Sequence, residues 1–247
     1  MKIPEKPRTT AIRLNSYIAD CGVTSRRKAD ELIQQGRVMV NNKVITSMGY
    51  KINSFKDKVF VDGERINLSQ PVYYLLNKPK GYVSTVSDDK GRPTVIELIR
   101  THIKIFPVGR LDYDTTGVLL LTNNGDFNQA MTHPSNNIKR EYDVKLDKIL
   151  SQDDEEKLLK GVFIEGGRGT FLTVTYPTNN KKAPTVVSSE GRNHFVKNMF
   201  KALGYTVTAL HRRSFGFLTV KDLPEGSYRE LTQRELKLVN RILNNKR

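Results

Sequence analysis

The stretch that says most about the fold is PVGRLDYDTTGVLLLT, residues 107–122. Its first half is a polar loop, bounded by glycines, that contains the two carboxylates Asp112 and Asp114. Its second half, residues 118–122, is an apolar run of the length expected for a buried strand. Because the loop leads directly into that strand, the sequence predicts that rigid structure holds both carboxylates in place.

The loop alone leaves two alternatives to an active site. Asp and Thr in a glycine-bounded loop often only satisfy backbone N–H groups in turns. Residues 112–116, DYDTT, also resemble the D-x-D-x-T motif of the haloacid-dehalogenase phosphatases, which use Mg²⁺. That family places its motif after an apolar strand, whereas here Pro107, Gly109 and Arg110 interrupt the preceding residues. This interruption argues against a phosphatase.

Outward from this loop, apolar runs separated by turn residues predict a domain of mixed composition. Strands are expected at 72–76, 118–122, 142–146, 170–176, 185–188, 207–210 and 217–220, and helices at 94–100, 126–131, 152–160, 193–203 and 232–243. Thr232 and Glu235 have the spacing of a capping box at the start of the last helix. Strands and helices without regular alternation favour an α+β domain with a mainly antiparallel mixed sheet flanked by helices.

A smaller unit precedes this domain. Two helical patterns, which contain Leu14 and Ile33, are followed by short strands at 38–40, 44–45 and 59–61 with Asn-Asn and Asp-Gly turns. Cys21, the single cysteine, lies on the apolar face of the first helix and is expected in the core. Residues 68–71, LSQP, read as a linker. We expect a flexible tail at 1–10, a small unit at 11–68 and a larger domain at 69–247.

The charge indicates the kind of partner. The chain has 41 Lys and Arg against 26 Asp and Glu, a net charge of +15. Such an excess favours a partner of opposite sign, although a basic surface can also serve solubility alone. Arg26, Arg27 and Lys28 fall in the first turn of the second helix, where cations oppose the helix dipole. A phosphate bound at that helix start would explain them.

The N-terminal unit resembles the S4 RNA-binding domain. The similarity rests on RLNSYIADCGVTSRRKADELIQQGRVMVNNKVI, residues 13–45, and on VFVDGERI, residues 59–66. The resemblance implies a small S4-type domain that binds RNA and performs no chemistry itself. It assigns RNA binding to Arg26, Arg27, Lys28, Arg37 and Lys43.

The rest of the chain resembles the pseudouridine synthases of ribosomal RNA, namely type A, which serves the small ribosomal subunit, and type B, which serves the large one. The similarity rests on GRLDYDTTGVLLLTNNGD from residue 109, LLNKPKGYVST from 75, KREYDVKL from 139, EGRNHFVKNMFKALGY from 190 and LHRRSFGFLTV from 210. It implies a larger catalytic domain that isomerises a uridine to pseudouridine. The fragments DDKGRPTV, GRLDYDTTG and MTHPS favour type B, and therefore 23S ribosomal RNA.

The resemblance also assigns catalytic residues. Asp112 is the essential carboxylate and acts as nucleophile or as base; the sequence does not choose between these. Tyr142 corresponds to a tyrosine that lies against the target base, although a strand aromatic in the core would give the same pattern. Lys197 stands where the family has Arg or Lys paired with the aspartate. The reaction needs no metal or other cofactor.

Other residues are expected to bind the substrate. A uridine in folded RNA must be flipped out to reach Asp112, at a cost of a few kcal/mol. Leu210 is expected to pack beside the uracil, and Arg110 to help extrude the nucleotide. His194, Lys197 and Lys201 fall on one face of the predicted helix at 193–203. They are expected to form a basic RNA-binding surface with further cations that include Arg212.

Partners and location follow from the same observations. The chain has no apolar run of the length of a membrane span and no signal peptide, so a cytoplasmic protein without membrane contact is expected. Its partner is expected to be ribosomal RNA, either free or within a large ribosomal subunit during assembly, and the protein is expected to act as a monomer. A non-catalytic, ribosome-associated RNA-binding protein remains the alternative, because it shares the charge and the S4 unit.

Overall fold

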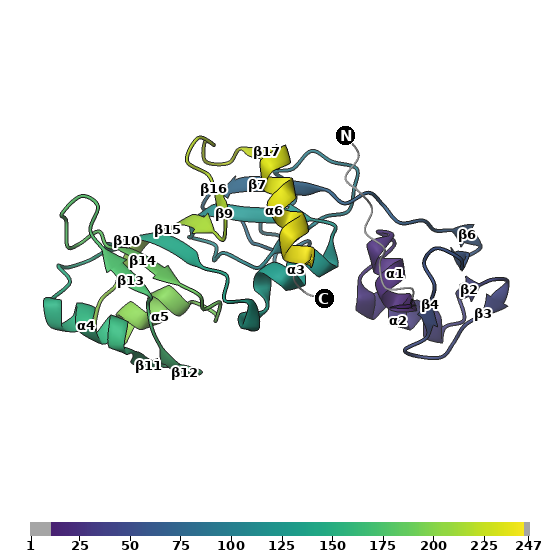
Figure 1. Ribbon diagram of the computed structural model, residues 1–247, viewed down its shortest axis with the longest axis horizontal. Coiled ribbons are helices and arrows are strands. Elements are labelled where there is room, and N and C mark those ends of the chain that lie inside the picture. Colours follow the sequence, from purple (N-terminus) through teal and green to yellow (C-terminus); the bar gives the residue numbers. More distant parts are fainter. Residues whose placement is uncertain (1–10, 245–247) are drawn as a thin grey trace. The chain divides into compact units, whose positions relative to one another are not determined.

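The computed structural model describes residues 11–244, and the expected tail at 1–10 lies outside that range. The chain divides into two compact units, and the division falls between Pro71 and Val72, at the end of the segment read as a linker. Figure 1 shows the helices and strands of each unit.

The first unit contains two helices and two small antiparallel sheets. The helices are α1 (Leu14–Asp20) and α2 (Arg26–Gln34). One sheet pairs β1 (Ile12–Arg13) with β4 (Lys51–Ile52). The other has the order β3-β2-β5-β6 and consists of β2 (Val38–Val40), β3 (Lys43–Val44), β5 (Val59–Val61) and β6 (Glu64–Arg65).

Local chemistry explains where the elements of this unit begin and end. Ser25 caps α2 by accepting the N–H of Lys28, and Gly36 follows the helix with a φ of +71° that suits glycine. The turns Asn41-Asn42 and Asp62-Gly63 have positive φ at both residues, as two-residue hairpin turns require. Leu14, Ile18 and Ile33 are buried in the core, as expected. Cys21 is only half-buried, because α1 ends at Asp20 and places the cysteine at the edge of the core.

The second unit is built on a nine-stranded mixed sheet, which confirms the predicted α+β class. Its main order is β13-β14-β10-β15-β9-β7-β17, with β16 paired to β15 and β8 to β9. The strands are β7 (Tyr73–Lys78), β8 (Phe106–Val108), β9 (Thr116–Thr122), β10 (Arg140–Leu146), β13 (Thr173–Thr175), β14 (Thr185–Ser188), β15 (Val207–Phe215), β16 (Leu218–Thr219) and β17 (Tyr228–Glu230). A separate hairpin pairs β11 (Val162–Ile164) with β12 (Gly167–Gly169). Within residues 72–244 the strand pairs of the large sheet are antiparallel except β9 with β15.

Four α-helices accompany the sheet, namely α3 (Gly125–Thr132), α4 (Gln152–Lys160), α5 (Phe195–Lys201) and α6 (Gln233–Asn244), with a 3-10 turn η1 (Pro134–Asn136) after α3. The expected capping box is present, because Thr232 accepts the N–H of Glu235 and the carboxylate of Glu235 accepts the N–H of Thr232.

The helix predicted at 94–100 is wrong. That segment forms turns, because the N–H of Val95 bonds to the carbonyl of Val83 and a β-bridge joins Val83 to Thr94. These contacts hold its first residues extended and leave too little chain for an α-helix. The helix predicted at 193–203 is shorter, because His194 has a left-handed backbone with φ of +50° and α5 begins after it.

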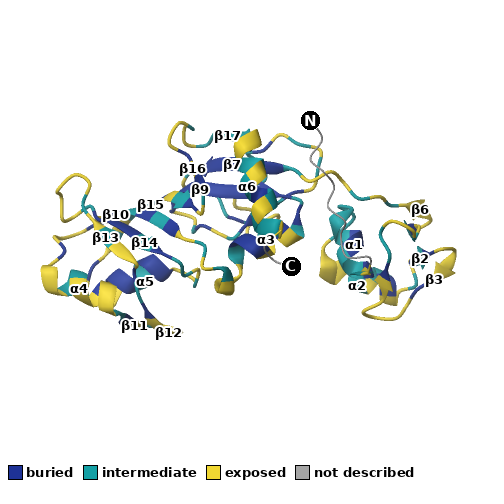
Figure 2. Ribbon diagram, viewed as in Figure 1, coloured by how far each residue is buried: buried dark blue, intermediate teal, exposed yellow. Residues whose placement is uncertain are grey.

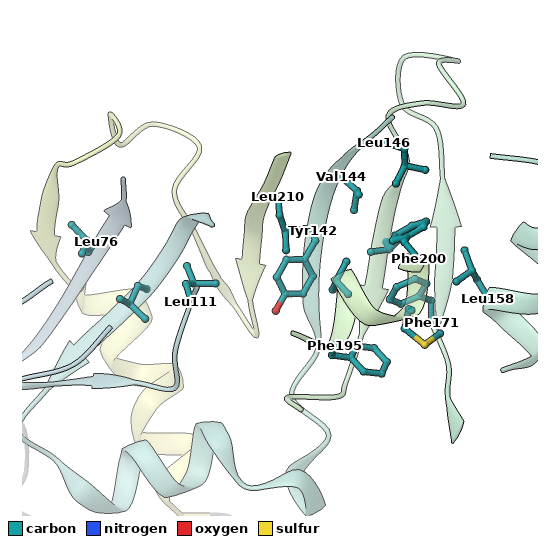
Figure 3. Close-up of a cluster of buried hydrophobic side chains, with 14 of the residues drawn as sticks. Leu76, Leu111, Tyr142, Val144, Leu146, Leu158, Phe171, Phe195, Phe200 and Leu210 are labelled. Atoms are coloured by element: carbon teal, nitrogen blue, oxygen red, sulfur yellow. The ribbon is translucent and has the colours of Figure 1, made fainter. Parts of the chain in front are cut away.

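Both faces of β7 and β9 are covered, so these two strands are buried along their whole length (Figure 2). On β9, Leu119 and Leu121 belong to one hydrophobic cluster, whereas Val118 and Leu120 belong to another. The first cluster also contains side chains of β10, α4 and α5. The second contains side chains of α3 and α6. Figure 3 shows part of the first cluster, with Leu111 on one side of the view and Tyr142 and Leu210 on the other.

Candidate active site

The site lies at the seam between two halves of the large sheet. β9 and β15 are joined there through two parallel pairs, His211 with Thr116 and Arg212 with Gly117. Gly117 has a φ of +106°, and a Cβ at this position would overlap the backbone of Arg212. A glycine is therefore required for the two strands to approach this closely. The seam brings the loop before β9 against residues of β10 and β15.

Hydrogen bonds from a buried lysine hold this loop in place. Lys78, at the end of β7, has no exposed surface. Its Nζ donates hydrogen bonds to the carbonyl oxygens of Pro79 at 3.0 Å, Asp112 at 3.0 Å and Thr115 at 2.9 Å. Burial lowers the pKa of Lys78 to about 8, and the carboxylates of Asp112 and Asp114 oppose that shift. This residue was not predicted from the sequence, because lysine is rarely buried.

Further hydrogen bonds fix the loop backbone around Asp112. Ser84 donates its hydroxyl to the carbonyl of Leu111 at 2.9 Å and accepts the Leu111 N–H at 3.1 Å. The N–H of Thr115 bonds to the carbonyl of Asp112, which closes a turn. The side chain of Asp112 is 24% exposed, so it reaches the surface from a backbone held by the sheet.

The structure brings Lys197 and His194 to the carboxylates. Nζ of Lys197, on α5, lies 3.0 Å from Oδ2 of Asp112 and 2.6 Å from Oδ1 of Asp114. His194 Nε2 lies 3.4 Å from Oδ1 of Asp112. The pair of Lys197 with Asp112 was expected from the sequence. Asp114 was expected to serve the loop alone, and its ion pair with Lys197 corrects that assignment.

The ion pair between Lys197 and Asp114 shifts the pKa of both partners. Burial lowers the pKa of Lys197, but the hydrogen bonds and charges of Asp114 and Asp112 outweigh burial and raise the pKa overall. Burial raises the pKa of Asp114, and Lys197 outweighs it, so that this pKa lies below its usual value. Two carboxylates therefore share one ammonium, which remains charged at neutral pH.

Asp112 faces a pocket of about 610 Å³. Tyr142 of β10 and Leu210 of β15 line the wall of this pocket, and both are buried. Figure 3 shows Leu210 beside the ring of Tyr142. An aromatic ring and a leucine next to a carboxyl group make a site suited to a flat, partly polar ring.

Two arginines of the pocket are buried. Arg140 donates to the carbonyl of Ser189 at 2.9 Å, Arg212 donates to that of Val118 at 2.8 Å, and both guanidinium groups lie about 5 Å from the ring centroid of Phe215. Burial lowers the pKa of Arg212, and the neighbouring Tyr142 opposes that shift. Arg212 is 2% exposed and lines the pocket, so it belongs to the pocket wall and not to the exposed basic surface where it was expected; its role in substrate binding stays a prediction. The side chains of β15 alternate between two faces, and Arg212 points inward while Arg213 is exposed.

The other predicted substrate residues differ in position. Arg110 is exposed at the edge of the pocket. Lys201 is exposed at the end of α5 and is not among the residues that line the pocket. Because His194 precedes α5, the helical face expected for His194, Lys197 and Lys201 is interrupted at its first member.

The predicted RNA-binding residues of the first unit are on its surface. Arg26, Arg27 and Lys28 are exposed in the first turn of α2, and Lys43 is exposed on β3. Arg37 forms a two-pronged pair with Asp62, at 2.7 Å for each bond, so its charge is already partly balanced. In α2, the side chain of Ser25 already accepts one of the backbone N–H groups that a phosphate was expected to use.

Within residues 11–244 we find no group of three or more His, Cys, Asp and Glu side chains placed to hold a metal ion. In the same range, none of the helices has the length and apolar character needed to cross a membrane.

Comparisons with known proteins agree with both units. Residues 72–202 match the model of the RNA pseudouridylate synthase family, and residues 12–57 match that of the S4 domain. The chain is 41% identical to the ribosomal large subunit pseudouridine synthase B of Bacillus subtilis, over 91% of this chain and 94% of that protein. It is 36% identical to an uncharacterized RNA pseudouridine synthase of Aquifex aeolicus, over 94% of this chain and 98% of that protein. A crystal structure of a pseudouridylate synthase superposes with a TM-score of 0.67 at 31% identity, covering 92% of this chain and 99% of that one.

Proposed function

This chain belongs to the RNA pseudouridylate synthase family, and we propose that it isomerises one uridine of large-subunit (23S) ribosomal RNA to pseudouridine with Asp112 as the catalytic carboxylate. The observation that carries the proposal is the position of Asp112. Hydrogen bonds from Lys78 hold its loop, and its carboxylate pairs with Lys197. It faces a pocket that Tyr142 and Leu210 line.

The chemistry requires little beyond these groups. The bond between uracil N1 and ribose C1′ breaks, the base turns, and a new bond joins C5 to C1′ while the C5 proton leaves. Asp112 either attacks C1′ or removes a ribose proton. In either role the carboxylate acts in its ionised form, and the ammonium of Lys197, 3.0 Å from Oδ2, fixes its direction.

The pocket walls are suited to hold the detached base. The ring of Tyr142 and the side chain of Leu210 would enclose the uracil and keep it from diffusing away. Tyr142, which lines the pocket, is proposed to serve in removal of the C5 proton. Its partner across the strand pair is Arg212, whose buried guanidinium would hold the tyrosine hydroxyl in position.

Substrate binding would be shared by the two units. Arg110 and His194 at the pocket would contact the flipped nucleotide and its phosphates. The RNA backbone outside the pocket would be contacted by further exposed cations, namely Lys201, Arg26, Arg27, Lys28 and Lys43. Arg37 would contribute less because of its pair with Asp62. The similarity to a large-subunit enzyme of Bacillus subtilis supports the choice of ribosomal RNA. We propose that the reaction proceeds without metal or other cofactor.

The decisive experiment compares Asp112→Asn with Asp114→Asn. Release of tritium from RNA labelled at C5 of uridine measures the reaction, in excess chelator and without added nucleotide or reductant. Asp112→Asn should abolish release while RNA affinity stays within a few-fold, since the side chains are nearly isosteric. Asp114→Asn, the comparison variant on the same loop, should have a milder effect because Asp114 does not line the pocket. Substantial turnover by Asp112→Asn would remove that residue from its role, and RNA binding by the wild type without tritium release would favour the non-catalytic RNA-binding alternative.

A further inference from the structure

We propose that Tyr113 is a stacking platform for the nucleotide next to the target uridine, and thereby a positioning residue of this enzyme. The proposal rests on the proposed function, because it concerns the RNA on either side of a flipped uridine. It adds a residue that neither the family comparison nor the expected catalytic set assigns.

Tyr113 is a large aromatic residue at the edge of the pocket. It lies between Asp112 and Asp114, is 48% exposed and lines the same pocket as Asp112. A Cβ built on Gly81 would lie 3.9 Å from the Tyr113 hydroxyl oxygen, so the ring extends from the catalytic loop towards the turn at Gly81. It therefore presents one aromatic side chain beside the catalytic carboxylate.

The side chain of Tyr113 has no evident part in folding the loop. Backbone hydrogen bonds fix the loop at this point, since the carbonyl of Tyr113 accepts the N–H of Gly81 at 2.9 Å and lies 3.5 Å from Nζ of Lys78. About half of the Tyr113 side chain is exposed to water, on a loop whose backbone is held in place. Tyrosine in such a position carries a large contact surface at low cost in conformational entropy, which suits a binding residue.

Tyr113 stands beside a polar rim that borders a second hollow. Arg92 is 45% exposed, pairs with Asp88 at 2.7 Å, and is close enough to the Tyr113 hydroxyl for that group to help raise its pKa, after the larger effect of Asp88. Both Arg92 and Asp88 also line a second hollow of about 490 Å³ that contains Val86. The pocket thus continues past this rim, where the chain beside the flipped nucleotide can run.

Flipping a uridine leaves its neighbour without a stacking partner. An exposed ring on a fixed loop can replace that partner, because each nucleobase has a π-face. Removal of such a ring lowers RNA affinity roughly 5- to 150-fold per stacked base. The stack is present both before and during the chemical step, so its loss should raise KM and leave kcat nearly unchanged.

The test uses three variants of the full chain and an RNA hairpin that contains the modified uridine, as located by pseudouridine mapping. Tyr113→Ala should lose roughly 5- to 150-fold in kcat/KM, mostly through KM. Tyr113→Phe keeps the ring and should remain near the wild type. Phe163→Ala, at an aromatic residue that is 79% exposed on β11 and does not line the pocket, is the matched control and should have no effect. Equal melting temperatures would exclude a folding defect.

A modified RNA identifies the stacked base. In two further hairpins, an abasic nucleotide replaces either the 5′ or the 3′ neighbour of the target. One of these hairpins should lower kcat/KM of the wild type as much as Tyr113→Ala lowers it on the unmodified hairpin. On that same abasic hairpin, Tyr113→Ala should have nearly the same kcat/KM as the wild type. Wild-type kinetics for Tyr113→Ala, or a loss that adds fully to that of both abasic hairpins, would overturn the proposal.

Binding in an Asp112→Asn background separates this proposal from the proposed function. A wild type that binds the RNA without isomerising it would refute the proposed function alone. Equal RNA affinity of Asp112→Asn with and without Tyr113→Ala would refute the stacking role alone.

Discussion

Replacing Lys78 with methionine tests whether a buried ammonium positions the catalytic loop. Methionine has a similar unbranched stem, but its thioether cannot donate a hydrogen bond. Three carbonyl oxygens, at 2.9 to 3.0 Å from Nζ in the wild type, would lose a charged donor in a site without solvent. Two of them belong to the turn that carries Asp112, so stability and turnover should both fall.

The size of the effect follows from two opposing contributions. Hydrogen bonds to a charged group contribute about 1.5–3 kcal/mol each, or about 4.5–9 kcal/mol for three. Against this, burial lowers the pKa of Lys78 from 10.5 to about 8, and removal of the ammonium recovers about 3 kcal/mol. The net loss is about 3 kcal/mol, which corresponds to a fall of roughly 6–12 °C in Tm for a unit of this size.

The pH dependence gives an independent check. The folded-state pKa of Lys78 lies below its unfolded value, so between about pH 8 and 10.5 the unfolded chain binds more protons. The free energy of unfolding of the wild type should therefore rise with pH in this window relative to Lys78→Met, by up to about 1.4 kcal/mol per pH unit. Below about pH 8 the difference should stay constant, because Lys78 is then charged in both states.

The assay is denaturant unfolding at about pH 7.5 and 10, together with tritium release at neutral pH. Lys80→Met, two residues away and exposed, is the matched control and should change neither quantity. Equal Tm for Lys78→Met and the wild type, with unchanged turnover, would refute the anchoring role. A stability difference that does not widen above about pH 8 would refute the reasoning about charge.

Three further predictions concern other parts of the molecule. Lys197→Met should lower kcat roughly 30-fold with little change in RNA affinity, because the energy of a partly buried ion pair lies between about 0–1 kcal/mol for an exposed pair and about 3–5 kcal/mol for a buried one. Lys197→Arg should retain far more activity, and equal rates for the two variants would make Lys197 only an RNA contact. Replacing Arg26, Arg27 and Lys28 together with glutamine should reduce the slope of log affinity against log salt by about 2, and an unchanged slope would exclude them from phosphate binding. Gly117→Ala should prevent folding of the large sheet or lower its Tm sharply, as circular dichroism would measure, and a stable variant would contradict the close approach at the seam.

Much of the fold could be predicted from periodicity and turn chemistry. The two-residue turns at Asn41-Asn42 and Asp62-Gly63, and the capping box at Thr232, depend on local sequence and are present. The helix at 94–100 failed because a contact with Val83, which is remote from any local signal, outweighed a weak helical pattern. Short edge elements such as β17 and the β11–β12 hairpin also escaped, since they contain few residues and little alternation.

The site was predictable to a different extent. The resemblance named Asp112 and Lys197, and the structure places them 3.0 Å apart; their roles remain predictions. Lys78 was missed because composition alone gives no reason to bury a lysine. Arg212 was expected on the surface because it stands in the basic run HRR. On a strand, however, adjacent side chains point to opposite faces, so Arg212 points inward and Arg213 outward. The second partner of Lys197, Asp114, depends on a loop conformation that sequence spacing does not define.

The seam between β9 and β15 has a consequence for how this enzyme could be divided. Lys78 and Asp112 belong to the half of the sheet that contains β7 and β9. Tyr142 and Leu210 belong to the half that contains β10 and β15, and Lys197 belongs to α5. Two residue pairs join those strands. A chain cut between β9 and β10 would yield two fragments, each with part of the chemistry and neither with an active site. Activity would return only when the fragments reassemble, both across the seam and through the pairing of β17 with β7, which the cut also separates. Such a pair of fragments could serve as a split reporter of association.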